Sequence, residues 1–426
     1  MSISSQVKYN TKPNSVPGRQ FQYVCQAAGG AAPIAGSRNS VIQISIPAKR
    51  GQYLDTSSSF LRYSIKGQAD DGSNGMTCHT QGPMSIFSKF EVTHGAALCE
   101  SIASYNTCCA AFTDATVSQE SRIGAMSAMG GTDPATSGVG VSLGTHSSMP
   151  GNSDRKTVCT PVLLSGILSP NNDSFLPIGF AHSSDFVINL TLEAPEQCLV
   201  GGSGATACSY ELSNVAFVAT IIELDPQTDA AVYQAAMQAG NGVVRVSGES
   251  YRCFSTSLAA TDTAFSQALP CRFSSLNALF GMFQLQNTQN VITSKSISQR
   301  MKPTNLALNW RVGSSVQPPH QITTGPEMFM NLARCFNSVS IANADSCHTG
   351  TTYNHSSDGT FLCGYELSLW NSQSQVIDSG LDSISNSNLA FEGTLTAISG
   401  GALITSVARY SHAMVIDPAG GLQVVF

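Results

Sequence analysis

Charged residues are scarce in this sequence of 426 amino acids. Asp, Glu, Lys and Arg make up 11% of the chain, whereas soluble proteins average roughly 25%. The formal net charge is -6, which excludes a strongly basic protein that binds nucleic acid through its charge. Hydrophobic residues reach an ordinary 42%, so the chain can form sizeable cores and is not disordered.

Long apolar runs and paired cysteines are also missing. No run approaches the roughly 18 apolar residues that span a bilayer, and the polar stretch Met1–Gln20 lacks the apolar core of a signal peptide. The 13 cysteines are odd in number and contain no CxxC pair. We therefore expect free, mostly buried cysteines in a protein assembled under reducing conditions, not a disulfide framework.

Short apolar runs that alternate with polar residues dominate the remainder and are typical of half-buried strands. They predict strands at 41–46, 60–65, 86–92, 158–164, 186–192, 212–224, 243–246, 276–285, 306–312, 361–370, 389–398, 403–416 and 422–426. Helices are predicted at 229–238 and 325–336, and a third at 96–112, where Leu98, Ile102 and Tyr105 follow helical spacing.

The two halves of the sequence repeat one plan. Each half ends in a long apolar strand followed by Asp-Pro, at 225 and 417, which lie 192 positions apart. This distance fits one β-sandwich, and no βαβ alternation occurs, so we predict an all-β chain of two antiparallel sandwiches. The predicted organisation is an extended arm (1–36), a first sandwich (37–226) with a long loop (113–156), a helical connector (227–241) and a second sandwich (242–426).

Motifs for catalysis and cofactor binding are absent. The sequence contains no GxSxG, HExxH or P-loop pattern. Gly201–Gly204 is interpreted as a loop, and Gly138, Gly140 and Gly144 fail the dinucleotide spacing. Cys347, His348 and His355 lack a fourth zinc ligand at motif spacing, as does the Cys108–Cys109 pair.

Carboxylates from distant strands could serve a glycosidase without leaving a spacing rule. The candidates are Glu91, Glu100, Asp185 and Glu366. Ordinary strand-end or solvent-facing positions explain them equally well. Basic residues are dispersed apart from Lys49–Arg50, without interleaved aromatics. We therefore predict no catalytic, cofactor-binding or metal-binding residues, and no enzyme.

Four groups of segments stand out in order along the chain. They are Val41–Pro47 with Tyr53–Thr56 and Phe60–Tyr63; Ile86–Val92 with Gly95, Glu100–Ile102 and Tyr105–Asn106; Leu176–Ile178 with Phe186–Leu192; and Val407–Asp417 with Gly421–Phe426. Together they resemble the double jelly-roll major capsid proteins of tailless icosahedral DNA viruses. The likeness is greatest to the polinton-like virus and virophage group.

This resemblance implies two consecutive eight-stranded jelly rolls and a structural role in a virion. Three copies would form a pseudo-hexagonal capsomer, and capsomers would tile an icosahedral shell assembled inside the host cell. The loop 113–156 and the region 345–358 would lie at the outer crown or between subunits, and the arm 1–36 would reach the shell interior or a neighbouring tile. Implied partners are further copies, penton and minor capsid proteins and an internal membrane, without sequence-specific nucleic-acid binding.

A carbohydrate-binding or carbohydrate-active double sandwich is the alternative. It would need exposed aromatic side chains along a groove, and Trp310 and Trp370, the two tryptophans, both fall in predicted strands. A secreted adhesin would need an export signal and paired cysteines, which the sequence does not indicate.

Overall fold

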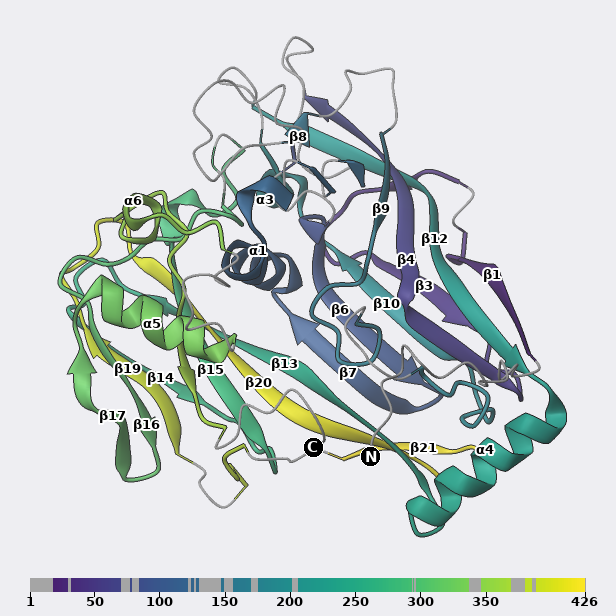
Figure 1. The fold of residues 1–426 in the computed structure, drawn as a ribbon. Coiled ribbons are helices and arrows are strands. Elements are labelled where there is room, and N and C mark those ends of the chain that lie inside the picture. The colour runs from purple at the N-terminus through teal and green to yellow at the C-terminus, as the bar shows by residue number, and fades with distance from the viewer. Residues whose placement is uncertain are drawn as a thin grey trace, which may run out of the picture.

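The computed structural model is a pair of β-sandwiches that lie side by side (Figure 1). The described residues are 18–29, 32–69, 77–78, 84–121, 124–125, 128–129, 147–148, 156–169, 175–200, 206–292, 294, 296–336, 346–368, 380–384 and 388–425. Among them, no helix is long and apolar enough to cross a membrane.

The first sandwich is built from two antiparallel sheets. One sheet has the order β1 (Gly18–Gln26), β12 (Cys208–Leu224), β4 (Gln52–Ala69) and β9 (Lys156–Thr160), with β2 (Ile34–Ala35) also paired to β12. The other has the order β3 (Val41–Ile46), β10 (Phe186–Leu192), β6 (Phe87–His94) and β7 (Ala97–Ala103). A small third sheet joins β11 (Leu199–Val200), β5 (Thr77–Cys78) and β8 (Ser147–Ser148).

The second sandwich repeats the arrangement. One sheet has the order β13 (Val244–Leu258), β20 (Ala402–Ile416), β15 (Leu276–Leu285) and β18 (Cys363–Glu366), with β21 (Leu422–Val425) paired to β20. The other has the order β14 (Ala264–Leu269), β19 (Leu389–Thr394), β16 (Ala307–Val312) and β17 (Ser315–Ile322).

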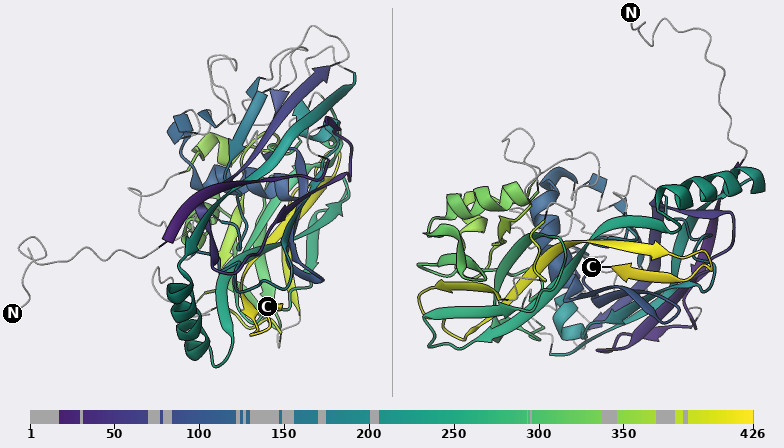
Figure 2. Two further views of the ribbon diagram at one scale, coloured as in Figure 1. Left: turned by 90° about the vertical axis from the view of Figure 1, so that its right-hand side faces the viewer. Right: turned by 90° about the horizontal axis from the view of Figure 1, so that it is seen from below.

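Both sandwiches are jelly rolls with one topology. When the eight main strands of each are counted along the chain, the two sheets take the order 1-8-3-6 and 2-7-4-5 in both halves. Every pair of main strands is antiparallel. The predicted fold class, two consecutive eight-stranded jelly rolls with a few short helices, is confirmed (Figure 2).

The helices lie in the connections between strands. They are α1 (Tyr105–Thr116), α2 (Gln119–Ser121), α3 (Pro195–Cys198), α4 (Pro226–Ala239), the 3₁₀ helix η5 (Gln286–Thr288), α5 (Gly325–Cys335) and α6 (Gly350–Tyr353). α4 joins the two jelly rolls. Asp225 precedes it as the N-cap, and its carboxylate accepts a hydrogen bond from the Gln227 amide at 3.2 Å.

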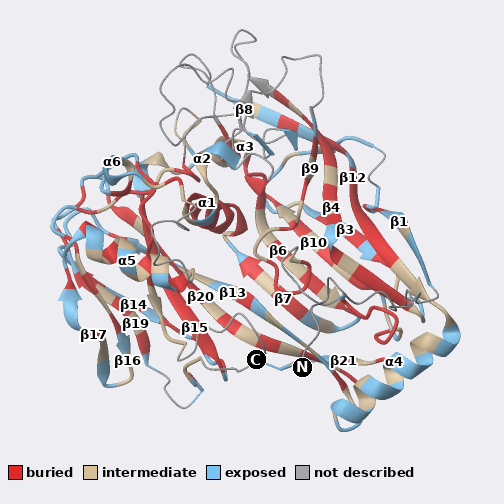
Figure 3. Ribbon diagram, in the orientation of Figure 1, coloured by how far each residue is buried: buried red, intermediate tan, exposed pale blue. Residues whose placement is uncertain are grey.

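Strand patterns explain where the cores form. β10 alternates buried and half-buried residues along its whole length, because one side faces the sandwich interior. β15 is buried at nine consecutive positions, since its other face is covered as well (Figure 3). The buried side chains form two hydrophobic clusters, one centred on each jelly roll.

Two predictions about local structure were wrong. Residues 96–112 form strand β7 followed by helix α1, not one helix, and Leu98 on β7 is 50% exposed. Gly18–Gln26, within the predicted arm 1–36, pairs with β12 over nine residues and so belongs to the first sheet. The predicted loop 113–156 begins only after α1, and most of it lies outside the described residues.

Candidate functional site: the junction and the exposed edges

Helix α1 forms the junction between the two jelly rolls (Figure 1). One side of it contributes Tyr105, which stacks on Phe90 of β6 at 5.2 Å between ring centroids and belongs to the first core. The other side contributes Phe112, which contacts Tyr251 of β13 at 5.2 Å and Phe280 of β15 at 4.8 Å. The helix therefore takes part in both cores and fixes one jelly roll against the other.

A buried carboxyl group links the same two units through hydrogen bonds. Glu100 on β7 accepts a hydrogen bond from Ser165 Oγ at 2.6 Å, from the Gly166 amide at 2.8 Å and from Ser250 Oγ on β13 at 2.5 Å. Burial raises the pKa of Glu100 above its usual range, although these donors favour the carboxylate. The arrangement holds strands of both jelly rolls together, and the carboxyl group is buried.

A buried ion pair adds a second polar link. Asp114, near the end of α1, bonds Arg300, which precedes β16, and both side chains are at most 2% exposed. Removing one partner of such a pair leaves an uncompensated charge in the protein interior. The pair therefore fixes α1 to the second jelly roll.

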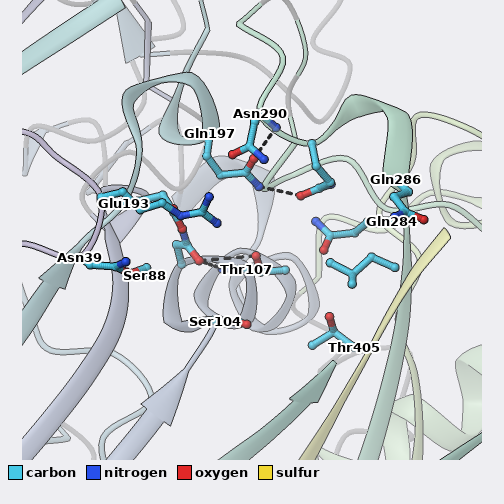
Figure 4. Close-up of a pocket in the computed structure, with 14 residues that line it drawn as sticks. Asn39, Ser88, Ser104, Thr107, Glu193, Gln197, Gln284, Gln286, Asn290 and Thr405 are labelled. Atoms are coloured by element: carbon cyan, nitrogen blue, oxygen red, sulfur yellow. Dashed lines mark hydrogen bonds between the residues drawn. The ribbon is translucent and has the colours of Figure 1, made fainter. Parts of the chain in front are cut away.

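A polar cleft of about 420 Å³ lies beside α1. Its lining is rich in carboxamides and hydroxyls and has one basic and one acidic side chain: Arg38, Asn39, Ser88, Ser104, Asn106, Thr107, Glu193, Gln197, Gln284, Gln286, Gln289, Asn290, Leu403 and Thr405. Gln197 bridges the two sides, because its side chain donates to Gln289 Oε1 at 2.7 Å and accepts from the Asn290 amide at 2.8 Å (Figure 4).

Apolar side chains are exposed at both outer ends of the molecule. Tyr23 and Val24 on β1 are 44% and 41% exposed, and Val41 on the neighbouring edge strand β3 is 53% exposed. Met330 on α5, in the second jelly roll, is 46% exposed. Unpaired strand edges with apolar side chains are a common way for one chain to meet another.

The four carboxylates considered for glycosidase chemistry have separate partners. Glu91 accepts from Ser101 Oγ at 3.0 Å and Asp185 from Ser45 Oγ at 3.0 Å. Glu366 accepts from Arg409 Nη2 at 3.0 Å, and Glu100 is buried at the junction. Each of the four is held by different partners, so the structure does not assemble them into an acid–base pair.

The cysteine and histidine candidates are likewise dispersed. Cys347 donates to the Val117 carbonyl at 2.9 Å, His348 Nδ1 bonds Thr360 Oγ1 at 2.9 Å, and His355 Nδ1 accepts from the Asp358 amide at 2.9 Å. Among the described residues no group of three His, Cys, Asp or Glu side chains could hold a metal ion.

The remaining sequence candidates fall in three places. Trp310 is fully buried and stacks on Phe391 at 4.2 Å, so it offers no platform for a sugar ring. Lys49 and Arg50 lie between β3 and β4, where Arg50 bonds His182 Nε2 at 3.0 Å. Trp370, Gly201–Gly204, Gly138, Gly140 and Gly144 lie outside the described residues.

The sequence did not point to the junction. Asp114 and Arg300 are separated by 186 positions, and neither stands in a motif. The sequence indicates Glu100 only as one of several scattered acids and as part of a segment that resembles capsid proteins. A signal was available in hindsight, because an acid between Cys99 and Ile102 on an apolar strand needs buried hydrogen-bond donors.

The chain matches known proteins at the level of solved structures. No family model and no curated protein matches the sequence. Three solved structures of major capsid proteins align over almost the whole chain. The Faustovirus major capsid protein has a TM-score of 0.64 at 9% identity and covers 96% of this chain and 92% of its own.

PBCV-1 VP54, fitted into a reconstruction of the virophage Sputnik, has a TM-score of 0.62 at 12% identity, covering 98% of this chain and 100% of its own. The mavirus major capsid protein has a TM-score of 0.52 at 10% identity, covering 100% and 94%. The resemblance inferred from the sequence is thus confirmed at the level of fold: the chain has the double jelly-roll architecture seen in these capsid proteins.

Proposed function

We propose that this chain is a structural major capsid protein. Three copies form a pseudo-hexagonal capsomer of six jelly rolls, and capsomers tile an icosahedral virus shell. The observation that supports this best is the presence of two jelly rolls of one topology, fixed side by side by α1, in an arrangement that matches capsid proteins from end to end.

The surface chemistry supports an assembling protein. The cores of protein interfaces are depleted in charge, and uncharged polar side chains form hydrogen bonds there without the cost of desolvating ions. The exposed edges β1 and β3 and the helix α5 present apolar side chains at opposite ends of the molecule. We further propose that the chain divides at the connector 227–241, which contains α4.

The remaining parts of the proposal follow from a structural role. The protein acts in the virion, is assembled inside the host cell and is not an enzyme. Penton proteins, minor capsid proteins and an internal membrane are its further partners. A net charge of -6 argues against direct packing of the genome by this chain.

The oligomeric state tests this proposal. The purified chain should elute as a trimer in size-exclusion chromatography with light scattering, and trimers should show hexagonal outlines or shells in negative-stain microscopy. A chain that stays monomeric at high concentration and never forms shells would contradict the capsid function.

A further inference from the structure

The repeated topology gives each jelly roll a helix in the same connection. α1 lies between β7 and β9 in the first jelly roll, and α5 lies between β17 and β18 in the second. β7 and β17 occupy the same last place in their sheets, and so do β9 and β18. α1 and α5 are therefore equivalent elements, just as β1 and β13 are equivalent first strands.

Within the chain, the helix of the first jelly roll packs on the first strand of the second. Phe112 of α1 contacts Tyr251 of β13, and the thiols of Cys108 and Cys253 lie 3.1 Å apart. Ten of the 12 residues of α1 are buried, by its own jelly roll on one side and by the second jelly roll on the other. This contact shows how one jelly roll of this chain can bind the next.

The equivalent elements α5 and β1 each keep an exposed side among the described residues. α5 buries Met328, Leu332 and Cys335 against its own jelly roll. Its opposite side carries Pro326, Met330 and Arg334, spaced four residues apart and all exposed.

β1 is exposed in a similar way. Of its nine residues only Cys25 is buried. Tyr23 and Val24 are adjacent in the strand, so their side chains point to opposite faces of the sheet, and both are exposed. Val41 on the nearby strand β3, whose Ile44 bridges to Ala27, is exposed as well. β13, the equivalent strand, has its Tyr251 covered by α1.

We propose that α5 of one copy docks on the β1 and β3 edge of a second copy, in the manner in which α1 docks on β13 within the chain. The second copy is the occupant because the chain itself carries the surface that this kind of helix binds. α5 and β1 lie at opposite ends of one molecule (Figures 1 and 2), so the contact joins different copies head to tail. Such a contact closes into a ring when the rotation permits.

This inference rests on the proposed function for the number of copies, since three chains with six jelly rolls would close the ring. Beyond the number of copies, α5 and the β1 and β3 edge are the two surfaces that meet. The contact is heterologous, meaning that every junction takes α5 from one copy and β1 from the next.

Two charge substitutions test the surfaces. Met330→Asp disables α5, and Tyr23→Asp disables the β1 edge. Each variant alone should weaken association by roughly 30-fold or more, as expected for a central apolar contact, and should run as a monomer where the wild type is trimeric. Val232→Asp is the matched control, because Val232 is 40% exposed on another helix, α4; it should form trimers. Thermal unfolding of each variant establishes that it is folded.

Mixing the two variants provides the decisive measurement. The Met330→Asp copy keeps an intact β1 edge and the Tyr23→Asp copy keeps an intact α5, so the mixture can form one junction but cannot close a ring. Light scattering should detect a complex of two chains that contains one copy of each variant.

The outcomes separate this inference from the proposed function. A wild-type chain that never trimerises contradicts the capsid proposal itself. A trimeric wild type with trimeric Met330→Asp and Tyr23→Asp variants overturns only the docking surfaces. They are also overturned if folded variants give a mixture of monomers alone, or if Val232→Asp abolishes trimers as strongly as the other two.

Discussion

His412 should make the stability of this protein depend on pH in a predictable direction. It lies on β20, is 3% exposed, and neither ring nitrogen has a hydrogen-bond partner among the described residues. Burial lowers its pKa from 6.5 to about 4 because the charged imidazolium is poorly solvated in the protein interior.

The sign follows from the order of the two pKa values. The unfolded chain binds a proton at His412 near pH 6.5, whereas the folded chain does so only near pH 4. The contribution to stability is therefore fully present above pH 6.5 and is lost as the pH falls towards 4. At 1.36 kcal/mol per pH unit, the loss amounts to about 3 kcal/mol over this interval.

Urea unfolding between about pH 7 and pH 4.5 measures this loss as a fall in the free energy of unfolding. His412→Gln carries no titrating ring, so its free energy of unfolding should fall by about 2 to 3 kcal/mol less than that of the wild type across the interval. If His412→Gln loses as much stability on acidification as the wild type, the reasoning is refuted.

Further predictions concern the junction and the thiols. Arg300→Met should lower the free energy of unfolding by about 3 to 5 kcal/mol, because it removes the cation that pairs with the buried carboxylate of Asp114. Adding Asp114→Leu should restore much of this loss in denaturant titrations. Gly166→Ala should lower the free energy of unfolding by about 1 to 3 kcal/mol through overpacking. The added Cβ would overlap the Glu249 carbonyl of β13 and lie 2.7 Å from the His412 ring. A lower melting temperature would reveal this loss. A thiol-reactive dye should modify the half-buried Cys159 and Cys208 first in the native protein, because burial raises the pKa of most other described cysteines; mass spectrometry of labelled peptides checks the order.

Strands with a strong apolar signal were predictable from local sequence. The predicted strands 186–192 and 276–285 coincide with β10 and β15. In β10 the alternation reflects one buried face, and in β15 the mostly apolar run reflects two. The beginning of the helix predicted at 325–336 coincides with that of α5, because Pro326 and Glu327 are typical of a first helical turn. Its predicted end lies one residue beyond that of α5.

The edge strands β1 and β17 were missed because they carry little apolar pattern. β1 has a single buried residue, and β17 contains Pro318 and Pro319, which are tolerated at a sheet edge but rarely occur in a central strand. In 96–112 the helical spacing of Leu98, Ile102 and Tyr105 was coincidental. The chain changes from strand to helix at Ser104, whose φ of 48° is left-handed.

The junction could not be predicted because its partners are distant in sequence. Glu100 and Ser250 lie 150 positions apart, and their contact exists only once both sandwiches have formed. The equivalence of α1 and α5 is also a property of topology, since it depends on which strands flank each helix and not on residue identity.

The few charged residues are unevenly distributed in the structure. The protein does not avoid burying charge: Glu100, Asp114 and Arg300 are all at the junction, and Arg409 pairs with the buried Glu366. By contrast, some outward elements carry little charge. Arg19 is the one charged residue of β1, and the one acid of α4, Asp229, accepts a hydrogen bond from Tyr53 at 2.8 Å. A neighbouring chain that covers the β1 edge would therefore have to desolvate little charge on that strand, whereas α5 carries Glu327 and Arg334.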